Sequence, residues 1–308
     1  MDIVFMGTPE FAVPCLQRLI DDGHNVKGVF SQPDKPKGRG HKMQFPPVKE
    51  CAVNAGIPVY QPLKMRDGEA MAILEELKPE LIIVVAYGKI LPKEILDYPK
   101  YGCINMHASI LPRYRGAAPI QWSVLNGEKF SGVTAMQMDV GLDTGDMLLT
   151  KTVEIGNNET AGELHDKLSV LGADVMAETI DLLLKGSLNP QKQDDELSNY
   201  APMLSKELCP VDWNESARKV HNKVRGLSPW PVATTRCGER NFKIHKTVIS
   251  DARGGKPGEV IEAGKRLVVS CGDSTAVEIV VLQTEGKKAM NASDFLRGNP
   301  IEVGTIFE

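Results

Sequence analysis

Residues 81–86 read LIIVVA, six apolar side chains in succession. A strand with one face in water alternates apolar and polar residues, whereas a strand buried on both faces does not. The run therefore predicts an inner strand of a parallel sheet that is covered by helices on both sides.

The segments before this run repeat an order of strand and then helix. Short β-prone stretches alternate with stretches whose apolar residues recur every three or four positions. Strands are predicted at residues 2–6, 25–31 and 58–61, and helices at 9–20, 48–55 and 67–77. This order predicts an α/β domain over residues 1–188, with a Rossmann-like, open, parallel-type sheet and flanking helices.

A long helical pattern over residues 160–185 is expected to close this domain, and Thr160 and Glu163 are spaced as a capping box at its start. Residues 189–206 are polar and rich in Gln, Asn and Pro, a composition that predicts a linker between two domains.

Residues 207–308 are predicted to form a second, smaller domain. A helix over 216–225 is followed by short β-prone runs separated by glycines. These runs are 233–236, 242–248, 258–262, 267–271 and 276–282. Short strands at this spacing indicate a small β-barrel that resembles the oligonucleotide-binding barrel.

The 308 residues have an ordinary globular composition, 42% apolar and 25% charged, and a net charge of −4. The longest apolar run, residues 81–87, is far shorter than the roughly 20 residues of a membrane-spanning helix, and residues 1–10 lack the features of a signal peptide. A cytoplasmic location is therefore expected. The six cysteines form no C-x-x-C pair, so reduced thiols and no metal site are expected.

The segment 104–119 has the densest chemical signal. It begins as a strand and then breaks, and it carries Asn105 and His107 two positions apart, on the same side of the strand. Ligands of open parallel sheets bind where strands end. An amide can hydrogen-bond a developing oxyanion and an imidazole can move a proton, so the pair is suited to acyl transfer.

A second segment, residues 138–146, places Asp143 in a turn with Gly141 and Gly145 on either side. A turn Asp commonly hydrogen-bonds its own backbone. If the turn lies opposite His107, however, the carboxylate could orient the imidazole and support proton transfer.

Together these segments resemble the folate-dependent formyltransferase family. The resemblance is carried by Asn105-x-His107, by the following Ser109–Pro112, and by Gly141–Gly145. The opening Gly7–Phe11, the run Arg113–Ile120 and the trailing β domain resemble the members that act on methionyl-tRNA. The similarity extends over essentially the whole chain.

The resemblance implies that Asn105, His107 and Asp143 are catalytic and that Ser109, Ile110, Leu111 and Pro112 line the folate site. It also implies that 10-formyltetrahydrofolate is the formyl donor and that the α-amine of initiator methionyl-tRNA attacks the formyl carbon through a tetrahedral intermediate. No nicotinamide or flavin is expected, because Gly7–Phe11 lacks the three-glycine dinucleotide fingerprint. No metal is expected at Asn105, His107 and Asp143, because one amide, one imidazole and one carboxylate bind divalent metals poorly without further ligands. No membrane and no protein partner is predicted.

Residues 31–42 hold four Lys or Arg against one Asp, with glycines on both sides of Arg39. Such a loop is expected to be exposed and cationic, able to contact a phosphate backbone. By resemblance it reaches the acceptor end of the initiator tRNA through Arg39, Lys37 and Lys42.

Two alternatives remain open. The chain could be another member of the family, one that formylates a nucleotide-linked sugar amine or that oxidises or hydrolyses formyl-folate. It could also be a non-catalytic RNA-binding protein on the same scaffold. The second domain favours tRNA over a sugar, and the intact set of Asn105, His107 and Asp143 favours an enzyme.

Overall fold

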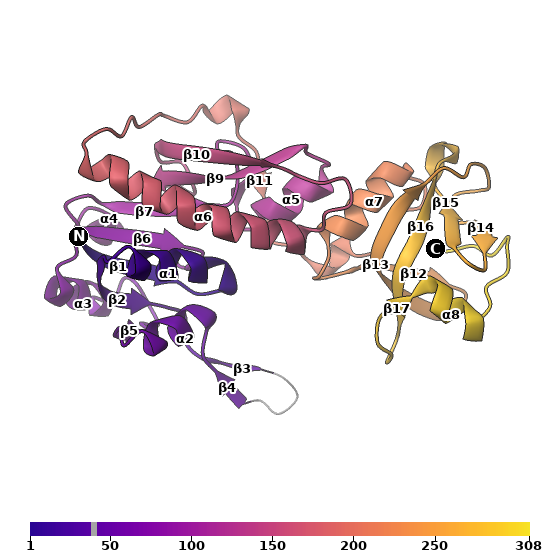
Figure 1. Cartoon of the computed structure of the whole chain (residues 1–308), viewed down its shortest axis with the longest axis horizontal. Coiled ribbons are helices and arrows are strands. Elements are labelled where there is room, and N and C mark those ends of the chain that lie inside the picture. Colours follow the sequence, from indigo (N-terminus) through magenta and orange to yellow (C-terminus); the bar gives the residue numbers. More distant parts are fainter. Residues whose placement is uncertain (38–41) are drawn as a thin grey trace. The chain divides into compact units, whose positions relative to one another are not determined.

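The computed structural model describes residues 1–37 and 42–308, which divide into two compact units (Figure 1). Unit 1 comprises Met1–Gly116, Ser131–Val153 and His165–Tyr200, and unit 2 comprises Ala117–Phe130, Glu154–Leu164 and Ala201–Glu308. Each unit is thus assembled from separate stretches of sequence. The predicted division into 1–188, a linker at 189–206 and 207–308 stays a prediction.

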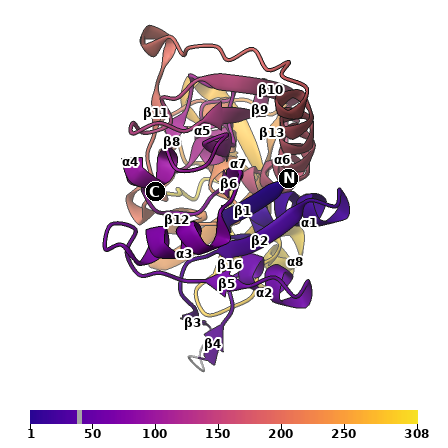
Figure 2. The ribbon, with the colours of Figure 1, turned by 90° about the vertical axis from the view of Figure 1, so that its left-hand side faces the viewer.

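Unit 1 is built on a seven-stranded sheet with the order β10-β9-β7-β6-β1-β2-β5 (Figure 2). Its strands are β1 (Asp2–Gly7), β2 (Asn25–Phe30), β5 (Val59–Tyr60), β6 (Leu81–Val85), β7 (Cys103–His107), β9 (Phe130–Gln137) and β10 (Met147–Glu154). The helical elements are η1 (Glu10–Ala12), α1 (Val13–Asp21), α2 (Pro47–Asn54), α3 (Glu69–Leu77), α4 (Lys93–Leu96), α6 (Ala161–Leu184) and η2 (Asp195–Leu197). The predicted α/β class is confirmed, and the strands and helices predicted before residue 107 lie within one or two residues of these bounds.

The apolar run 81–86 forms β6, and each of its five strand residues is buried. Helices on both faces of the sheet explain this burial. On one face, Ala70 and Leu74 of α3 share a hydrophobic core with Ile82 and Val84. Long helix α6 lies beside α1 and β9, because Gly172 of α6 comes close to Cys15 and Val133 (Figure 1).

The sheet is parallel from β7 through β6, β1 and β2 to β5 and changes direction beyond β7. Strand β9 pairs with β7 in antiparallel register, with Asn105 opposite Met136 and His107 opposite Thr134. The expected parallel-type sheet is therefore mixed. The helix between β7 and β9, α5 (Pro119–Leu125), belongs to unit 2 and supplies no crossover on this sheet, whereas parallel neighbours need such a crossover.

The basic segment at residues 31–42, which is expected to be a loop, contributes to a short hairpin. Strands β3 (Lys35–Lys37) and β4 (Lys42–Gln44) pair in antiparallel register, with Lys37 opposite Lys42. No alternation of apolar and polar residues marks these three-residue strands in the sequence. Arg39 lies outside the described residues.

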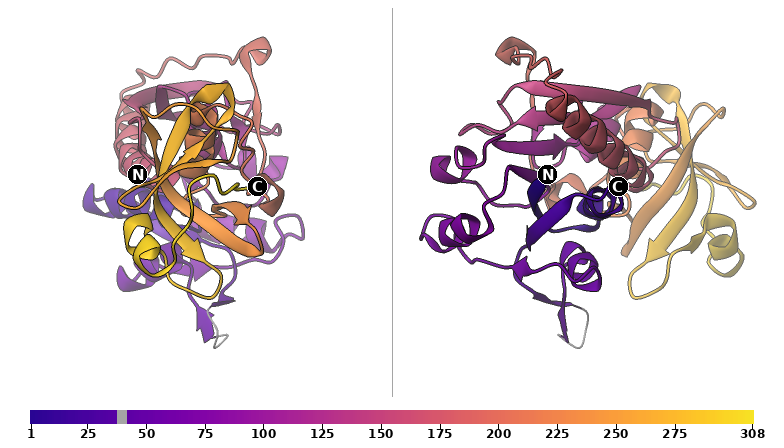
Figure 3. Two further views of the ribbon diagram at one scale, coloured as in Figure 1. Left: turned by 90° about the vertical axis from the view of Figure 1, so that its right-hand side faces the viewer. Right: turned by 60° about the vertical axis from the view of Figure 1, so that its left-hand side comes forward.

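Unit 2 contains α5 (Pro119–Leu125), α7 (Ala217–Gly226) and a six-stranded sheet with the order β12-β13-β16-β15-β14, in which β17 also pairs with β16 (Figure 3). Its strands are β12 (Ala233–Cys237), β13 (Arg240–Ser250), β14 (Val260–Ala263), β15 (Leu267–Ser270), β16 (Ala276–Thr284) and β17 (Met290–Asn291). The smaller elements are α8 (Ala292–Gly298), η3 (Lys206–Leu208) and η4 (Gly272–Ser274). Arg115 and Gly116 of unit 1 form the short strand β8 (Arg115–Gly116), which pairs with β11 (Tyr200–Ala201).

The segment after α8 links the two edges of this sheet. Glu308 exchanges backbone hydrogen bonds with Arg236 of β12 at 2.9 and 2.7 Å. On the other side, Val260 of β14 donates to the carbonyl of Thr305 at 2.8 Å, and Phe307 donates to that of Gly258 at 2.8 Å. The antiparallel sheet thereby closes into the small barrel that the sequence predicts.

The predicted starts of two helices are confirmed. Thr160 and Glu163 form a capping box before α6, since the amide of Thr160 donates to Glu163 at 2.8 Å and the amide of Glu163 donates to Thr160 at 3.2 Å. Ser216 caps α7 by accepting the amide hydrogen of Lys219.

Candidate functional site

Strand β7 carries the first two predicted catalytic residues to the end of the parallel strands. Asn105 pairs with Val84 of β6 on one side and with Met136 of β9 on the other, so its backbone is fixed by two neighbours. His107 is the last residue of the strand. Residues two apart on a strand share a face and are about 7 Å apart. Asn105 and His107 therefore point to one side of the sheet.

The carboxamide of Asn105 is available to a ligand. The residue is half-buried, and no hydrogen bond among the described residues uses its side chain. A half-buried amide without a protein partner is well placed to donate to an oxygen of a bound molecule.

The imidazole of His107 is held in one orientation. The residue is only 6% exposed, and its Nε2 lies 2.9 Å from the carbonyl oxygen of Tyr114. A carbonyl oxygen can only accept, so Nε2 carries the proton of this hydrogen bond. The other nitrogen, Nδ1, faces Asp143, with 3.7 Å between Nδ1 and Oδ2.

The structure brings Asp143 to the pair, as the sequence suggested. Its carboxylate accepts the amide hydrogen of Gly116 at 2.8 Å through Oδ2, the same atom that faces His107. Asp143 has a φ of 54°, in the left-handed region that Asp and Asn tolerate better than most residues. The carboxylate is thus presented by a turn that the chain must hold in an uncommon conformation.

Gly141 and Gly145, on either side of Asp143, are required because a side chain at either position would collide with neighbouring atoms. Neither glycine has a left-handed φ. A Cβ at Gly145 would lie 1.7 Å from the carbonyl oxygen of Gln137, and a Cβ at Gly141 would lie 2.0 Å from the hydroxyl of Thr144. Left-handed φ occurs at Asp143 between them. The loop consequently folds tightly against the end of β9.

Residues 109–112, predicted to line the folate site, form a turn directly after β7. Ser109 and Leu111 are buried, whereas Ile110 and Pro112 are half-buried. The hydroxyl of Thr134 donates to the carbonyl of Ser109 at 2.8 Å and accepts the amide hydrogen of Leu111 at 3.3 Å. The Leu111–Pro112 peptide is cis. One threonine of β9 therefore fixes the backbone of the turn, and its role in binding folate stays a prediction.

Of the predicted tRNA contacts, the structure describes only the backbones of Lys37 and Lys42, which face each other in the hairpin. The root of the hairpin is held by an ion pair. Lys49 of α2 contacts both carboxylate oxygens of Asp34 at 2.8 and 2.7 Å and the amide oxygen of Gln61 at 2.9 Å. The Lys49 ammonium also lies 4.0 Å from the centre of the Phe45 ring.

Gln193 also belongs to this site, although the sequence does not predict it. Its side chain donates to the carbonyls of Asp143 and Gly145, both at 2.8 Å. It lies in the polar stretch that is predicted to be a linker, where composition gives no sign of a specific partner. The only available signal was its amide, which can donate and accept at once.

The described residues also show where metal-ligating groups and thiols lie. Within residues 1–37 and 42–308 there is no group of three or more His, Cys, Asp or Glu that could hold a metal ion. Cys103 of β7 is buried, and burial raises the pKa of its thiol to about 12, which suppresses the nucleophilic thiolate. All six cysteines are free thiols, five of them buried and Cys51 half-buried. No helix in the described part of the chain is long and apolar enough to cross a membrane.

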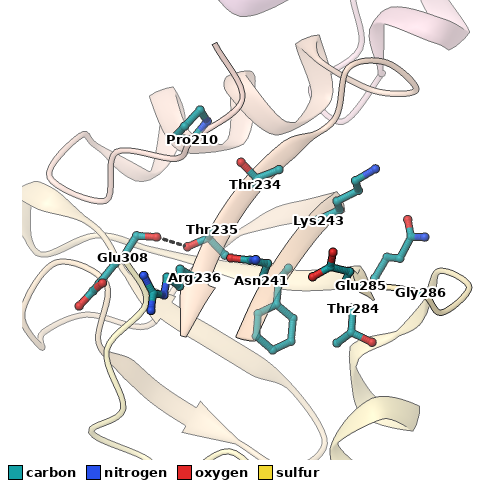
Figure 4. A pocket seen from close by; sticks show the side chains of 12 residues that line it. Pro210, Thr234, Thr235, Arg236, Asn241, Lys243, Thr284, Glu285, Gly286 and Glu308 are labelled. Atoms are coloured by element: carbon teal, nitrogen blue, oxygen red, sulfur yellow. Dashed lines mark hydrogen bonds between the residues drawn. The ribbon is translucent and has the colours of Figure 1, made fainter. Parts of the chain in front are cut away.

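A cavity of about 550 Å³ lies in unit 2, on the barrel (Figure 4). Its lining mixes cationic and anionic groups, among them Arg236, Lys243, Glu285 and Glu308. None of the predicted catalytic or folate-binding residues lines it. With both signs of charge in its wall, the cavity gives no strong preference for an anionic ligand.

Two family models match the chain. The model described as formyl transferase matches residues 1–180, and the model described as formyl transferase, C-terminal domain, matches residues 203–300.

Full-length relatives carry a more specific name. A protein named methionyl-tRNA formyltransferase from Clostridium novyi is 50% identical over 100% of both chains. A protein of the same name from Geotalea uraniireducens is 53% identical over 99% of this chain and 97% of its own.

Solved structures show the same fold at lower identity. The N-formyltransferase from Helicobacter canadensis, in complex with folinic acid and dTDP-3-aminofucose, superposes with a TM-score of 0.72 at 20% identity and covers 92% of this chain and 98% of its own. The methionyl-tRNA formyltransferase from Clostridium thermocellum gives a TM-score of 0.56 at 18% identity, over 82% and 94% of the two chains. The family models and the full-length relatives lead to one conclusion: the chain belongs to the formyl transferase family, among the methionyl-tRNA formyltransferases.

Proposed function

We propose that this chain transfers the formyl group of 10-formyltetrahydrofolate to the α-amine of initiator methionyl-tRNA. The observation that carries the proposal is the convergence of Asn105, His107 and Asp143 at the end of β7, in a chain half identical to proteins named for that activity. Charged initiator tRNA is a cytoplasmic substrate, so the proposal implies a cytoplasmic enzyme.

The reaction forms one bond between nitrogen and carbon and breaks another. The unprotonated amine attacks the formyl carbon, and the bond between that carbon and N10 of the folate breaks. The amine nitrogen loses one proton and N10 gains one, so the overall reaction requires no oxidant or reductant. An uncharged amine is already a nucleophile, and no covalent enzyme intermediate is needed.

Asn105 would stabilise the oxygen that becomes negative when the amine adds to the formyl carbon. Its carboxamide is half-buried and has no protein partner among the described residues, so its N–H groups can be directed at that oxygen without breaking an existing hydrogen bond. A donor fixed in a strand does not have to reorganise during the reaction.

His107 would act through Nδ1, because Nε2 is engaged with the carbonyl of Tyr114. A proton on Nδ1 would face Oδ2 of Asp143 at 3.7 Å, and the negative carboxylate would stabilise the positive ring. A substrate or water molecule beside Nδ1 of His107 and Oδ2 of Asp143 could receive or supply that proton. Asp143 would thereby support the transfer of a proton from the amine toward N10.

The turn 109–112 would form one wall of the folate site. Ile110 and Pro112 are half-buried and apolar, which suits contact with the flat face of a pterin ring. The polar groups of Ser109 are used internally, since its hydroxyl donates to the carbonyl of Arg113 at 2.6 Å. We therefore assign Ser109 to shaping this wall and the two half-buried residues to contact.

The tRNA would be contacted by the basic hairpin, through Lys37, Arg39 and Lys42, and by residues of 207–308. Cations on a hairpin can neutralise phosphates at the acceptor end without selecting a sequence.

A single assay tests the function against its alternatives. The purified chain is incubated with 10-formyltetrahydrofolate and one of three acceptors: charged initiator tRNA, a dTDP-linked amino sugar, or water alone. Formyl-methionyl-tRNA is expected only from the first, and His107→Ala serves as the inactive control. Formylated sugar or free formate as the main product would assign the chain to one of the other activities, and no product with any acceptor would favour a binding protein.

A further inference from the structure

The side chain of Gln193 is directed at the loop that presents Asp143. Its Nε2 donates one hydrogen bond to the carbonyl of Asp143 and one to the carbonyl of Gly145, each 2.8 Å long. Its Oε1 accepts a hydrogen bond from Nε of Arg115 at 3.0 Å. The two carbonyls belong to the loop that follows β9, and Arg115 belongs to the segment that follows β7. Nε2 also lies 3.6 Å from Sδ of Met136 on β9.

The chemistry of these partners fixes how the amide must lie. Carbonyl oxygens only accept, and a guanidinium only donates. The nitrogen of Gln193 must therefore face the carbonyls of Asp143 and Gly145, and its oxygen must face Arg115. No other uncharged side chain of this length offers two donors on one side and an acceptor on the other.

The loop that receives these hydrogen bonds needs support from outside. Asp143 has a left-handed φ of 54°, a conformation that persists only when its surroundings hold it. Gly116 holds the carboxylate at 2.8 Å, while Gln193 holds the main chain of the same residue. Gln193 also binds Arg115, the neighbour of Gly116. It therefore connects the residue next to the donor of the Asp143 carboxylate with the main chain of Asp143.

The polar segment around Gln193 has several other anchors. Gln191 exchanges backbone hydrogen bonds with Met147, both 2.8 Å long. The backbone carbonyl of Asn199 accepts from the amide of Arg115 at 3.0 Å. Loss of the Gln193 side chain would leave these contacts in place, so its effect on the Asp143 loop can be measured separately.

We propose that Gln193 is a positioning residue for the transfer reaction, which holds Asp143 opposite His107 from a segment whose composition is that of a linker. The inference rests on the proposed roles of Asp143 and His107 in formyl transfer. It assigns no contact between Gln193 and substrate.

The test compares Gln193→Ala with Gln191→Ala in the full-length chain. Gln191 is exposed two residues away and uses its backbone for pairing, so its substitution should leave kcat unchanged. Gln193→Ala should lower kcat about 10- to 100-fold, the range expected when a reacting group is displaced by about 1 Å. The KM values for folate and tRNA should change much less, because no binding contact is removed. Gln193→Glu should be equally poor, since its carboxylate cannot donate to the two carbonyls.

A double substitution separates positioning from a general structural effect. If Gln193 acts through Asp143, then Gln193→Ala should cost little further activity in a chain that already carries Asp143→Ala. An equal loss in both backgrounds, or a wild-type kcat for Gln193→Ala, would overturn the inference.

A third measurement does not depend on turnover. In protein labelled at its six histidines, the imidazole resonance of His107 is identified by its loss in His107→Ala. That resonance should shift in Gln193→Ala and stay in place in Gln191→Ala. Absence of activity in the wild-type chain would contradict the proposed function, whereas an unmoved His107 resonance in Gln193→Ala would contradict the role of Gln193.

Discussion

The carbonyl oxygen of Tyr114 lies 2.9 Å from Nε2 of His107 and determines which nitrogen of the ring is left for chemistry. Since the carbonyl only accepts, Nε2 keeps a proton and Nδ1 faces Asp143. Substrate protons can then be exchanged at one nitrogen only.

Asn105→Ala, His107→Ala and Asp143→Ala should each lower kcat while the chain stays folded. Loss of an oxyanion donor typically costs about 10²- to 10³-fold in rate, and this is the loss expected for Asn105→Ala. Single-turnover rates with saturating folate and charged tRNA measure the effect, with circular dichroism as the control for folding. Because the three residues act as a unit, double substitutions should cost less than the product of the single losses; near-normal turnover of a folded His107→Ala chain would remove this assignment.

Gly145→Ala should impair the reaction more than Gly141→Ala. The new Cβ at position 145 would lie 1.7 Å from a backbone oxygen, that of Gln137, which cannot move without shifting β9. At position 141 the nearest atom is the hydroxyl of Thr144 at 2.0 Å, which can rotate away. The midpoint temperature of thermal unfolding and kcat should both fall further for Gly145→Ala than for Gly141→Ala. Equal values for the two variants would mean that the loop relaxes freely.

Lys49→Met should weaken the use of tRNA without slowing the chemical step. Lys49 joins Asp34 and Gln61 at the root of the hairpin, and its hydrogen bond to Asp34 is the main reason why the pKa of that carboxyl is lowered. Without Lys49, the basic strands would lose their fixed attachment. The measurement is kcat/KM for charged initiator tRNA beside kcat at saturation. Lys27→Met is a matched control, since Lys27 pairs with Asp2 at 3.5 Å on β1 and β2, apart from the hairpin.

Arg39→Lys should lose much of the selectivity for initiator tRNA if the guanidinium makes a bidentate or wedging contact, because lysine lacks the planar fork. If Arg39 only neutralises phosphate, lysine should replace it. The comparison includes Arg39→Ala, Lys37→Ala and Lys42→Ala, each measured as kcat/KM for initiator tRNA. Similar small losses of kcat/KM in all four variants would mean that the loop attracts tRNA only through its general positive charge.

The stability of unit 2 should fall on mild acidification because of His221. Its Nδ1 lies 2.9 Å from the hydroxyl of Thr247 and its Nε2 lies 2.9 Å from the carbonyl of Asn157. Burial lowers the pKa of His221 below its ordinary value of 6.5. The unfolded chain then binds the proton more readily than the folded chain. The contribution of neutral His221 to the free energy of unfolding is therefore complete above pH 6.5, and it is lost as the pH falls from 6.5 toward the pKa of His221 in the folded chain.

Urea unfolding between pH 7.5 and 5 measures this dependence. His221→Gln should lower stability at the neutral end and flatten the decrease toward acid. A decrease with the same slope in the variant would show that other groups are responsible.

The sequence was most informative where structure depends on local pattern. The buried run 81–86, the capping box of Thr160 and Glu163 and the helix over 216–225 are all set by residues within a few positions of one another, and all three predictions are confirmed. The convergence of His107 and Asp143 was expected only if the turn around Asp143 lies opposite His107, and the structure meets this condition. Strand β9 runs antiparallel to β7 and ends beside Ile104, so it is the loop after β9 that brings Asp143 to His107.

The sequence was least informative where partners are distant. Gln193 binds residues about fifty positions earlier in the chain, and a polar composition looks the same whether a glutamine meets water or two carbonyls. The direction of β9 and the short hairpin strands β3 and β4 were missed for a related reason. Pairing direction and three-residue strands depend on neighbours that no local pattern specifies.

The burial of the thiols gives this protein a natural position for a reporter group. Five cysteines are enclosed, whereas Cys51 is half-buried on α2, the helix that also carries Lys49. A small maleimide fluorophore should therefore attach preferentially at Cys51, although burial raises the pKa of this thiol and slows the coupling. Emission from that position would follow the root of the hairpin in real time while tRNA arrives and leaves, with no residue exchanged in the protein.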